Sequence, residues 1–339
     1  MEGHFLSVAV CTYNGEQYIL EQLNSILSQN IPVDEIVVGD DGSSDNTVEV
    51  VKNRLSESSV QWSVIQNEKN LGYRKNFENV IAHTKGDLIF LCDQDDVWVP
   101  EKTEKIIREF DADPTCLMVF TDAYVTDSQL NVREGSLWDS FYLSENIDSF
   151  SDSWEMLLNG YYITGATACI KRELFEKSIP FSDIWVHDGW LGIHAAMYGT
   201  VRALPEKLIY YRQHDSNQIG VRGEATIRDK IRKKKEILQK GAEGQLRIHR
   251  EDRDRWREFY RKYKDTLPPE KKVQVRNAAK MFTELSRLPQ MSVLKRTRLI
   301  LDYYRKGYYQ LYCKHGKGVM MGDLLFLSWR RKDSSTETN

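Results

Sequence analysis

Short apolar segments alternate with helical patterns through the first 110 residues, and this alternation restricts the fold more than any other feature. Residues 5–11, 35–40, 62–67 and 87–92 are apolar and rich in β-branched side chains, as expected of strands buried on both faces. Helical spacing follows at 19–27, from about 46, over 73–83 and from about 100. The pattern predicts an α/β fold with a doubly wound, mostly parallel sheet.

Polar loops follow three of the expected strands, at residues 12–16, 40–45 and 93–96. Because parallel strands end at one edge of a sheet, we expect these loops to meet there and form a ligand site. In the second loop, Asp40 or Asp41 could accept a hydrogen bond from a pyrimidine N–H. Ser44 or Asp45 could at the same time cap the next helix.

The loop 93–96 contains three aspartates in four positions. Hard oxygen ligands suit Mg²⁺ or Mn²⁺, which usually takes one or two carboxylates together with phosphate oxygens of a substrate. A divalent ion here would neutralise a diphosphate leaving group as its charge develops. The alternative is an acidic loop without a metal, in which Asp96 caps the helix after Pro100.

Charge divides the chain into two parts. Residues 1–220 contain 16 Lys and Arg against 35 Asp and Glu, whereas residues 221–339 contain 31 against 15. We expect a catalytic domain over 1–220 and a basic helical domain over 221–331. The Ser-, Asn- and Gly-containing segment 215–223 is interpreted as a mobile lid, and the tail 332–339 as disordered.

The five cysteines form neither a CxxC motif nor a Cys/His cluster, which argues against a disulfide framework and a zinc site and favours a reducing compartment. The first residues lack the basic start and long apolar stretch of a signal peptide. No window approaches the roughly 20 apolar residues of a membrane-spanning helix. A cytoplasmic protein is therefore expected.

Four ordered segments within residues 5–110 resemble the inverting family 2 glycosyltransferases. They read SVAVCTYNGEQYILEQLNSILSQ, EIVVGDDGSSDNT, NLGYRKNFENVI and GDLIFLCDQDDVWVPEK. The resemblance implies the A-type glycosyltransferase fold, here followed by a C-terminal helical extension. It also implies transfer of a sugar from a nucleotide-sugar donor to an acceptor hydroxyl, assisted by Mn²⁺ or Mg²⁺.

The same resemblance implies roles for particular residues. The nucleotide pocket would be lined by Thr12, Tyr13, Glu16, Asp41, Arg74 and Asn76. Within it, Asp41 would bond the base, and Arg74 or Asn76 would complete the pocket. Asp93 would lie near the ribose and the metal, and Asp95 would bind the metal directly.

Asp188 is the expected catalytic base. The segments TGATACIKRELFEK and WVHDGWLGIHAAMYG resemble the acceptor side of the family, where an acid precedes a helix. Inversion in one displacement needs a carboxylate that takes the acceptor proton on the face opposite the leaving diphosphate. The alternative role for Asp188 is the N-cap of a helix that starts near Gly189.

The segment LIYYRQHDSNQIG resembles the rhamnosyltransferase-like branch of the family. It makes dTDP-rhamnose the leading donor, with UDP-hexoses next. Arg212 could meet the diphosphate with its planar guanidinium, and His214 could be a further metal ligand or a structural histidine.

The C-terminal part mixes basic residues with Tyr, Trp, Leu and Phe. This pattern fits a helix on an anionic membrane surface or a basic acceptor-docking surface. The alternative is a solvated helical bundle whose aromatic residues form its own core or a dimer interface. Nucleic acid is not expected, because no recognised motif accompanies the basic helices and the acidic half would repel phosphates. The resemblance and the basic half together suggest a lipid-linked glycan acceptor in bacterial surface polysaccharide synthesis, with the protein peripheral at the inner face of the plasma membrane.

Two other functions remain open: a nucleotidyltransferase, or a catalytically silent binding protein tethered by the basic half. A nucleotidyltransferase favours a Gly-rich basic loop that holds a triphosphate, whereas residues 12–16 offer one glycine, one acid and no base.

Overall fold

The computed structural model describes residues 3–214 and 227–325. The expected lid at 215–223, the domain border near 220 and the tail at 332–339 lie outside the described residues. The chain divides into two compact units, Met1–Leu157 with Tyr161–Arg222 and Leu158–Gly160 with Gly223–Asn339. Each unit is described by itself.

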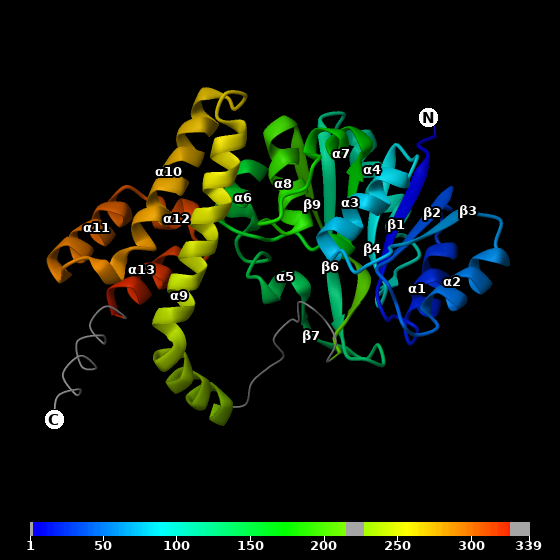
Figure 1. Cartoon of the computed structure of the whole chain (residues 1–339), viewed down its shortest axis with the longest axis horizontal. Helices are drawn as coiled ribbons and strands as arrows, with labels where there is room; N and C mark the ends of the chain where they lie inside the picture. The colour runs from blue at the N-terminus through cyan, green and yellow to red at the C-terminus, as the bar shows by residue number, and fades with distance from the viewer. Residues whose placement is uncertain (1–2, 215–226, 326–339) are drawn as a thin grey trace. The chain divides into compact units, whose positions relative to one another are not determined.

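The first unit begins with the alternation that the sequence predicts (Figure 1). Its first four strands run parallel in the order β3-β2-β1-β4: β1 (Leu6–Thr12), β2 (Glu35–Asp40), β3 (Gln61–Gln66) and β4 (Leu88–Asp93). Helices follow each of them: α1 (Ile19–Leu27), α2 (Thr47–Ser56), α3 (Tyr73–His83) and α4 (Lys102–Ala112). The predicted strand at 35–40 and helix at 73–83 are confirmed at both ends.

The rest of the sheet is mixed. It contains β5 (Val97–Trp98), β6 (Cys116–Thr126), β7 (Val132–Ser136), β8 (Ala168–Lys171) and β9 (Thr200–Arg212). β8 lies between β4 and β6 and is antiparallel to both, whereas β9 is parallel to β6. The connecting helices are α5 (Leu137–Ser140), η1 (Ile147–Ser149), α6 (Ser153–Asn159), η2 (Gly165–Thr167), α7 (Arg172–Ser178) and α8 (His187–Tyr198).

The core of this unit forms between the sheet and its helices. Val8 of β1, Ile36 of β2 and Phe90 of β4 are completely buried together with Leu23 and Ile26 of α1. The spacing of those two helix residues is the helical periodicity seen in the sequence. All five cysteines of the chain are free and buried.

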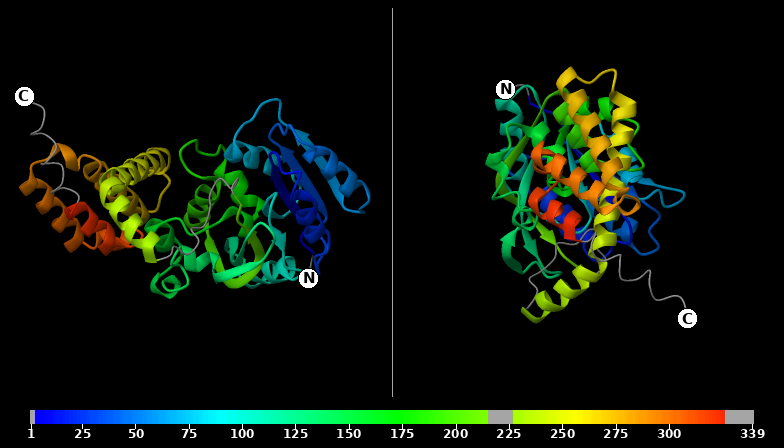
Figure 2. Two further views of the ribbon diagram at one scale, coloured as in Figure 1. Left: turned by 90° about the horizontal axis from the view of Figure 1, so that it is seen from below. Right: turned by 90° about the vertical axis from the view of Figure 1, so that its left-hand side faces the viewer.

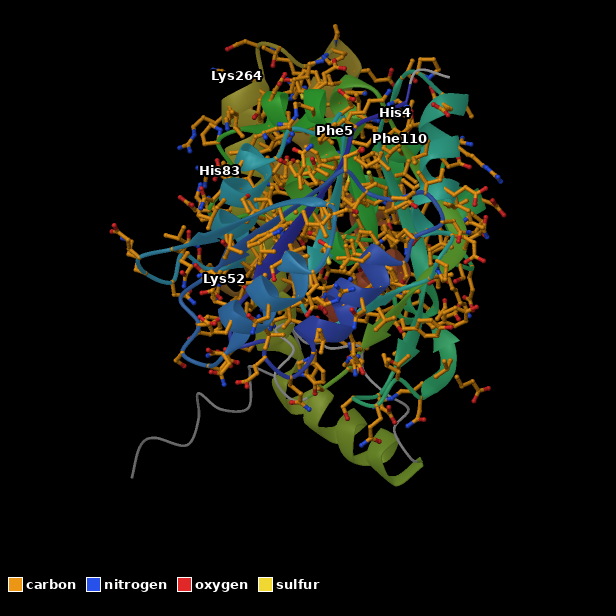
Figure 3. The ribbon with its side chains drawn as sticks, turned by 90° about the vertical axis from the view of Figure 1, so that its right-hand side faces the viewer. His4, Phe5, Lys52, His83, Phe110 and Lys264 are labelled. Atoms are coloured by element: carbon orange, nitrogen blue, oxygen red, sulfur yellow. The ribbon has the colours of Figure 1, made fainter. Side chains whose placement is uncertain are left out.

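A polar contact joins the start of the first strand region to the end of α4. Nε2 of His4 lies 3.0 Å from Oδ1 of Asp111, next to the buried ring of Phe110 in the chain (Figure 3). Both groups are partly exposed, so this pair contributes little to stability.

The second unit is helical. It contains α9 (Ile227–Tyr263), α10 (Pro269–Leu285), η3 (Leu288–Gln290), α11 (Val293–Arg305), α12 (Tyr308–Tyr312) and α13 (Gly316–Leu325). α10 runs alongside α9, separated from it in the chain by Pro268 (Figures 1 and 2). Buried aromatic residues, among them Phe259, Phe282 and Tyr309, form its core. In the described part of the chain, no helix combines the length and apolar character needed to cross a bilayer.

Candidate active site

The three polar loops meet at the carboxyl edge of β1, β2 and β4. The amide of Gln94 bonds the backbone of Tyr13 in both directions, since Oε1 accepts from Tyr13 N at 2.8 Å and Nε2 donates to Tyr13 O at 3.1 Å. A Cβ atom on Gly15 would lie 2.2 Å from the same amide oxygen. A side chain at position 15 would therefore displace the Gln94 amide from its two bonds to Tyr13.

The first loop is also tied to the second. Asn14 N donates to Oγ of Ser43 at 2.8 Å, and Oδ1 of Asn14 accepts from Ser44 N at 2.8 Å. Asn14 adopts a left-handed backbone conformation with φ 49°, which asparagine tolerates better than most residues. The three loops thus form one continuous polar surface, as the sequence predicts.

The first-loop residues expected in the nucleotide pocket differ in what they contact. Thr12 is buried and donates from Oγ1 to Oδ1 of Asp40 at 3.1 Å. The Glu16 carboxylate accepts from N and Nδ2 of Asn46 at 3.1 and 2.8 Å, at the start of α2. Tyr13 has a side chain that is 46% exposed. Thr12 and Glu16 hold the loops in place, while the Tyr13 ring is open to stack on a base.

Asp41 organises the loop that precedes α3. Its Oδ1 accepts from Leu71 N at 2.7 Å and from Nδ2 of Asn67 at 2.9 Å, and its Oδ2 accepts from Gly72 N at 2.9 Å. A carboxylate offers about four acceptor positions. The three donors leave Asp41 with about one position for a base N–H.

Asn76 and Arg74 lie on the first turns of α3. Asn76 is buried, donating from Nδ2 to Gly39 O at 2.8 Å. Arg74 bonds Tyr73 Oη through Nε at 3.2 Å and donates to the Asp183 carbonyl through Nη1. Asn76 therefore supports β2, and Arg74 ties α3 to the segment before α8. Their contact with a nucleotide remains a prediction.

Asp93 of the third loop lies among other acids. Among the described residues, none donates a hydrogen bond to the Asp93 side chain. Burial, followed by the nearby charges of Asp95 and Asp188, raises the pKa of Asp93 to about 7, although Lys102 opposes the shift. Acids this close repel one another when they are ionised, and a bound cation would offset that repulsion.

Asp96 is the deepest acid of this loop. One carboxylate oxygen accepts from Arg212 N at 3.0 Å, and the other has no partner among the described residues. Burial raises the pKa of Asp96 well above its ordinary value. α4 begins at Lys102 with Glu101 as its N-cap, so the alternative in which Asp96 caps this helix is wrong.

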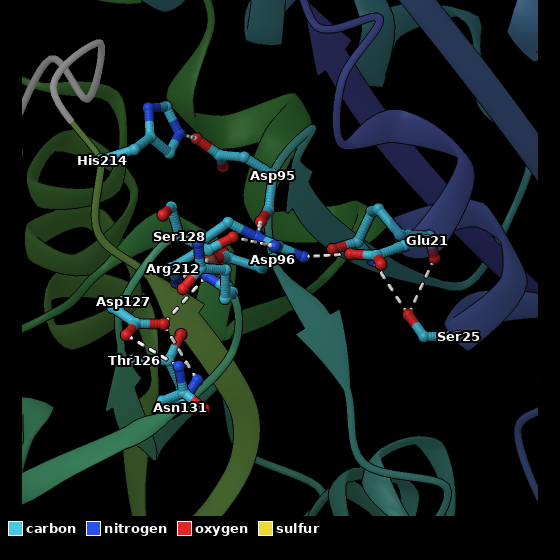
Figure 4. A network of polar contacts seen from close by, with 12 residues as sticks. Glu21, Ser25, Asp95, Asp96, Thr126, Asp127, Ser128, Asn131, Arg212 and His214 are labelled. Carbon is cyan, nitrogen blue, oxygen red and sulfur yellow. Dashed lines mark hydrogen bonds and ion pairs between the residues drawn. The ribbon is translucent and has the colours of Figure 1, made fainter.

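Asp95 and His214 lie together, as a shared metal would require. Oδ2 of Asp95 is 2.8 Å from Nε2 of His214 (Figure 4). The imidazole stacks on Tyr18 with ring centroids 4.7 Å apart. In residues 3–214 and 227–325, no three His, Cys, Asp or Glu side chains form a ready metal cage. A carboxylate with an imidazole still fits an ion that draws its other ligands from a donor diphosphate and water.

Arg212 is a structural support for this loop. Its Nε donates to Asp95 O at 2.7 Å, Nη1 donates to Ser128 O at 2.6 Å, and Nη2 pairs with the Glu21 carboxylate (Figure 4). All three guanidinium nitrogens are engaged with protein groups. A diphosphate would have to replace one of these bonds, so the expected contact remains a prediction.

Asp188 is the second residue of α8. Its Oδ2 accepts from Gly165 N at 3.0 Å, and its Oδ1 accepts from Gly189 N at 2.6 Å. The N-cap of α8 is Val186, and Asp188 lies within the first turn, where the helix dipole favours a negative charge. Because its charge also raises the pKa of Asp93, Asp188 lies near the acidic loop.

Lys102 is a residue of the site that the sequence did not single out. It is completely buried, donates from Nζ to Ala166 O at 2.8 Å and lies 4.0 Å from the centre of the Trp98 ring. Burial lowers the pKa of Lys102 to about 8. Ala166 follows Gly165, which holds Asp188, so Lys102 connects the acidic loop with the support of the expected base.

Helical spacing could have revealed Lys102. It occupies the same face of α4 as Ile106 and Phe110, both of them buried, at intervals of four residues. A lysine in an apolar stripe has to find a polar partner inside the protein.

His187 directly precedes Asp188 in the chain and is buried. Its buried imidazole stacks on Phe77 with ring centroids 4.1 Å apart, and neither ring nitrogen has a partner in the described part of the chain. A Cβ on Gly165 would lie 2.5 Å from Nε2 of His187. Burial lowers the pKa of His187, against the charge of Asp188, which favours the neutral ring.

Known proteins of similar sequence include mycobacterial proteins of undescribed function. One from Mycobacterium bovis is 28% identical over 214 residues, which cover 62% of this chain and 59% of the relative. A dTDP-rhamnosyl transferase, RfbG, from Shigella flexneri is 30% identical over 228 residues, covering 62% of this chain and 73% of RfbG. This chain thus spans less than two thirds of the mycobacterial relative and most of RfbG.

Solved structures show the same fold at low sequence identity. TarS (residues 1–349) of S. aureus in complex with UDP-GlcNAc has a TM-score of 0.54 at 16% identity, covering 96% of this chain and 91% of TarS. The mannosyltransferase PcManGT from Pyrobaculum calidifontis in complex with GDP-Man and Mn²⁺ has a TM-score of 0.53 at 17% identity, covering 97% and 88%. The expected A-type glycosyltransferase fold is confirmed.

The family model described as "Glycosyl transferase family 2" matches residues 7–178. The match begins in β1 and ends with α7, so it includes all three polar loops of the candidate site. This chain belongs to glycosyl transferase family 2.

Proposed function

We propose that the chain is an inverting glycosyltransferase, with Asp188 as its catalytic base. The observation that supports the proposal is that Asp188 accepts from Gly165 N, next to Ala166, whose carbonyl accepts from Lys102 of α4, so that Asp188 lies near enough to the acidic loop for its charge to raise the pKa of Asp93. Family membership supports the transfer reaction.

In the proposed reaction, the Tyr13 ring stacks on the base and Asp41 accepts a base N–H with its remaining lone pair. Asp188 takes the proton of the acceptor hydroxyl, whose oxygen bonds to the anomeric carbon as the bond to the diphosphate breaks. The two backbone N–H groups on Asp188 fix the direction of the carboxylate without neutralising it. A Mn²⁺ or Mg²⁺ ion held by Asp95 and His214 would stabilise the charge of the leaving diphosphate.

The donor is proposed to be dTDP-rhamnose, because RfbG, a dTDP-rhamnosyl transferase, is 30% identical over 228 residues. UDP-hexoses are the second choice. The acceptor is proposed to be a lipid-linked glycan of a bacterial surface polysaccharide, reached at the inner face of the plasma membrane. Burial of Tyr303, Tyr309 and Tyr312 inside the helical unit supports a bundle core rather than a dimer interface for these aromatic residues.

The donor site is tested first by thermal unfolding of the purified protein with dTDP-, UDP- and GDP-sugars, with and without Mn²⁺. A ligand at a hundred times its Kd should raise the free energy of unfolding by about 2.7 kcal/mol. We expect a Mn²⁺-dependent shift with dTDP-rhamnose, and NMR of the product should show the inverted anomer.

Each outcome decides between the alternatives. A shift with a nucleoside triphosphate but with no sugar nucleotide would favour a nucleotidyltransferase. Donor binding without transfer to any acceptor would favour a silent binding protein. Equal transfer in excess chelator would remove the metal from the proposal while leaving the transferase intact.

A further inference from the structure

One face of α11 presents leucines and arginines in alternation. Leu294, Arg298, Leu301 and Arg305 are spaced by four, three and four residues, so they lie along one stripe of the helix. Ile300 and Tyr303, which lie away from this stripe on the helix, are buried. The stripe therefore faces away from the core of the helical unit, and we call it the α11 face.

The apolar residues on this part of the helix are unusually open. The Leu294 side chain is 85% exposed and that of its neighbour Val293 is 49% exposed, whereas Leu301 is half-buried. A single exposed leucine is ordinary on a protein surface. Here the leucine protrudes from the first turn of a helix whose outer face is otherwise cationic, which is the pattern of helices that lie in a membrane interface.

The residues around α11 carry an excess of positive charge. Residues 271–325 contain 12 Lys and Arg but only three Asp and Glu. Those acids are engaged: Asp323 is buried and accepts from Tyr309, Glu284 accepts from Tyr303, and Asp302 pairs with Lys306 at 2.6 Å. In the described part of the chain, Arg298 and Arg305 form no ion pair. Arg298 and Arg305 are both exposed, so their charges face the solvent.

We propose that the α11 face docks the protein on an anionic phospholipid surface, with Leu294 entering the acyl boundary and Arg298 and Arg305 contacting headgroup phosphates. Charge complementarity selects this occupant. A second copy would bring the same excess of positive charge against the face, and a nucleic acid offers no apolar layer for a protruding leucine. Each cation near an anionic bilayer adds to the attraction, and the attraction falls with salt.

The test is co-sedimentation of the full chain with vesicles of phosphatidylcholine alone or with about 30% phosphatidylglycerol. We expect binding only to the anionic vesicles, weakened by salt. Leu294→Gln should reduce binding several-fold, and Arg298→Glu with Arg305→Glu should reduce it at least about tenfold. These residues are exposed, so unfolding curves of the variants should match the wild type.

Matched controls lie on α9, where basic and acidic residues are mixed. Ile248→Gln removes an apolar side chain that is 49% exposed, and Arg250→Glu reverses an exposed charge; both variants should bind vesicles as the wild type does. The inference rests on the proposed function for its membrane-bound acceptor, but the readout needs no sugar transfer, so loss of vesicle binding and loss of transfer are distinguishable.

Three results would overturn the proposal. The first is no binding to anionic vesicles, and the second is equal loss of binding in the α9 and α11 variants. The third is loss, in Leu294→Gln, of a dimer seen by sedimentation or of a nucleic-acid complex seen by gel shift, either of which would give the α11 face another occupant.

Discussion

Two aspartates, one buried and one half-buried, show how differently the two units use negative charge. Asp323, in the helical unit, is 4% exposed and accepts hydrogen bonds from His249 at 2.8 Å, Tyr309 at 2.7 Å and Gln245 at 2.5 Å. Asp93, in the sheet unit, has no donor among the described residues and a pKa raised to about 7 by burial. The Asp323 carboxylate has hydrogen-bond partners within the fold, and the Asp93 carboxylate has none among the described residues.

Buried polar groups in native proteins are nearly always paired, as Asp323 is, whereas the half-buried Asp93 side chain has no protein donor among the described residues and is partly open to solvent. The Asp323 network has the properties of a structural element, because Asp323 is 4% exposed and has three hydrogen-bond partners. The acids around Asp93 reduce stability in the empty protein, and a cation with a diphosphate would remove that cost. We therefore expect Asp323 to contribute to stability and the acids around Asp93 to contribute to function.

The largest effect is expected from Asp188→Asn. The amide keeps the size of the side chain but cannot take a proton, so kcat should fall about 10³-fold, within the range for loss of a general base. Donor affinity and the unfolding midpoint should change little. The measurements are steady-state transfer and calorimetric donor binding. Retention of more than a tenth of wild-type kcat would assign the base to another residue.

The next effect belongs to the helical unit. Asp323→Asn removes a charge that three donors surround, and should lower the free energy of unfolding by about 3 kcal/mol. Donor Kd, measured below the unfolding transition, should stay within about twofold. Urea unfolding and calorimetry make the comparison. A large loss of donor affinity with an unchanged midpoint would show that the two units do not divide stability and function in this way.

Local patterns predicted the parts of the fold that local forces determine. The strand at 35–40 and the helix at 73–83 were predictable because burial periodicity is a property of neighbouring residues. The antiparallel β8 was not, because its partners β4 and β6 are distant in the chain and only tertiary packing chooses them. Sheet order is a nonlocal property that a single sequence shows only weakly.

The site follows the same division. The acidic loop and Asp188 were predicted from residue type and family resemblance, since carboxylates after apolar strands stand out in the sequence. The Gln94 bonds to Tyr13 and the Lys102 bond to Ala166 connect segments far apart in the chain. Arg212 was expected to face a diphosphate because of its chemistry. Its guanidinium contacts protein groups, which sequence alone does not reveal, and the diphosphate contact remains a prediction.

Lys102→Met tests whether the buried cation supports the acidic loop. Methionine fills the space but leaves Ala166 O without a donor and Asp93 without its cation. It also removes a buried charge whose pKa falls to about 8 on folding, so the two effects oppose each other and stability near pH 8 should change by less than about 2 kcal/mol. Apparent Mn²⁺ affinity should fall about tenfold and recover partly at higher pH, because a metal needs the carboxylates ionised.

The control for Lys102→Met is Lys105→Met on the same helix, where the ammonium pairs with Glu206 at a partly exposed position. This substitution should change stability by less than about 1 kcal/mol and leave Mn²⁺ affinity unchanged. Equal effects of the two variants would show that Lys102 acts only through packing of α4.

The smallest expected effect has an unusual sign: Asp93→Asn should stabilise the empty protein. An aspartate whose pKa rises from 3.8 in the unfolded chain to about 7 in the fold binds its proton more tightly when folded. Stability from this group is therefore present at low pH and lost as pH rises from about 4 to 7. Asparagine has no charge to lose.

In chelator, the wild type and Asp93→Asn should thus be about equally stable near pH 4, and the variant should be more stable by about 1 to 2 kcal/mol at pH 8. Urea unfolding across this pH range measures the difference. Adding donor and Mn²⁺ at pH 8 should make the wild type more stable than the variant. Only the wild type has the Asp93 carboxylate, whose charge the bound cation would stabilise. If the variant were instead less stable at pH 8 in chelator, Asp93 would be as well satisfied in the fold as Asp323, and the contrast between the two acids would fail.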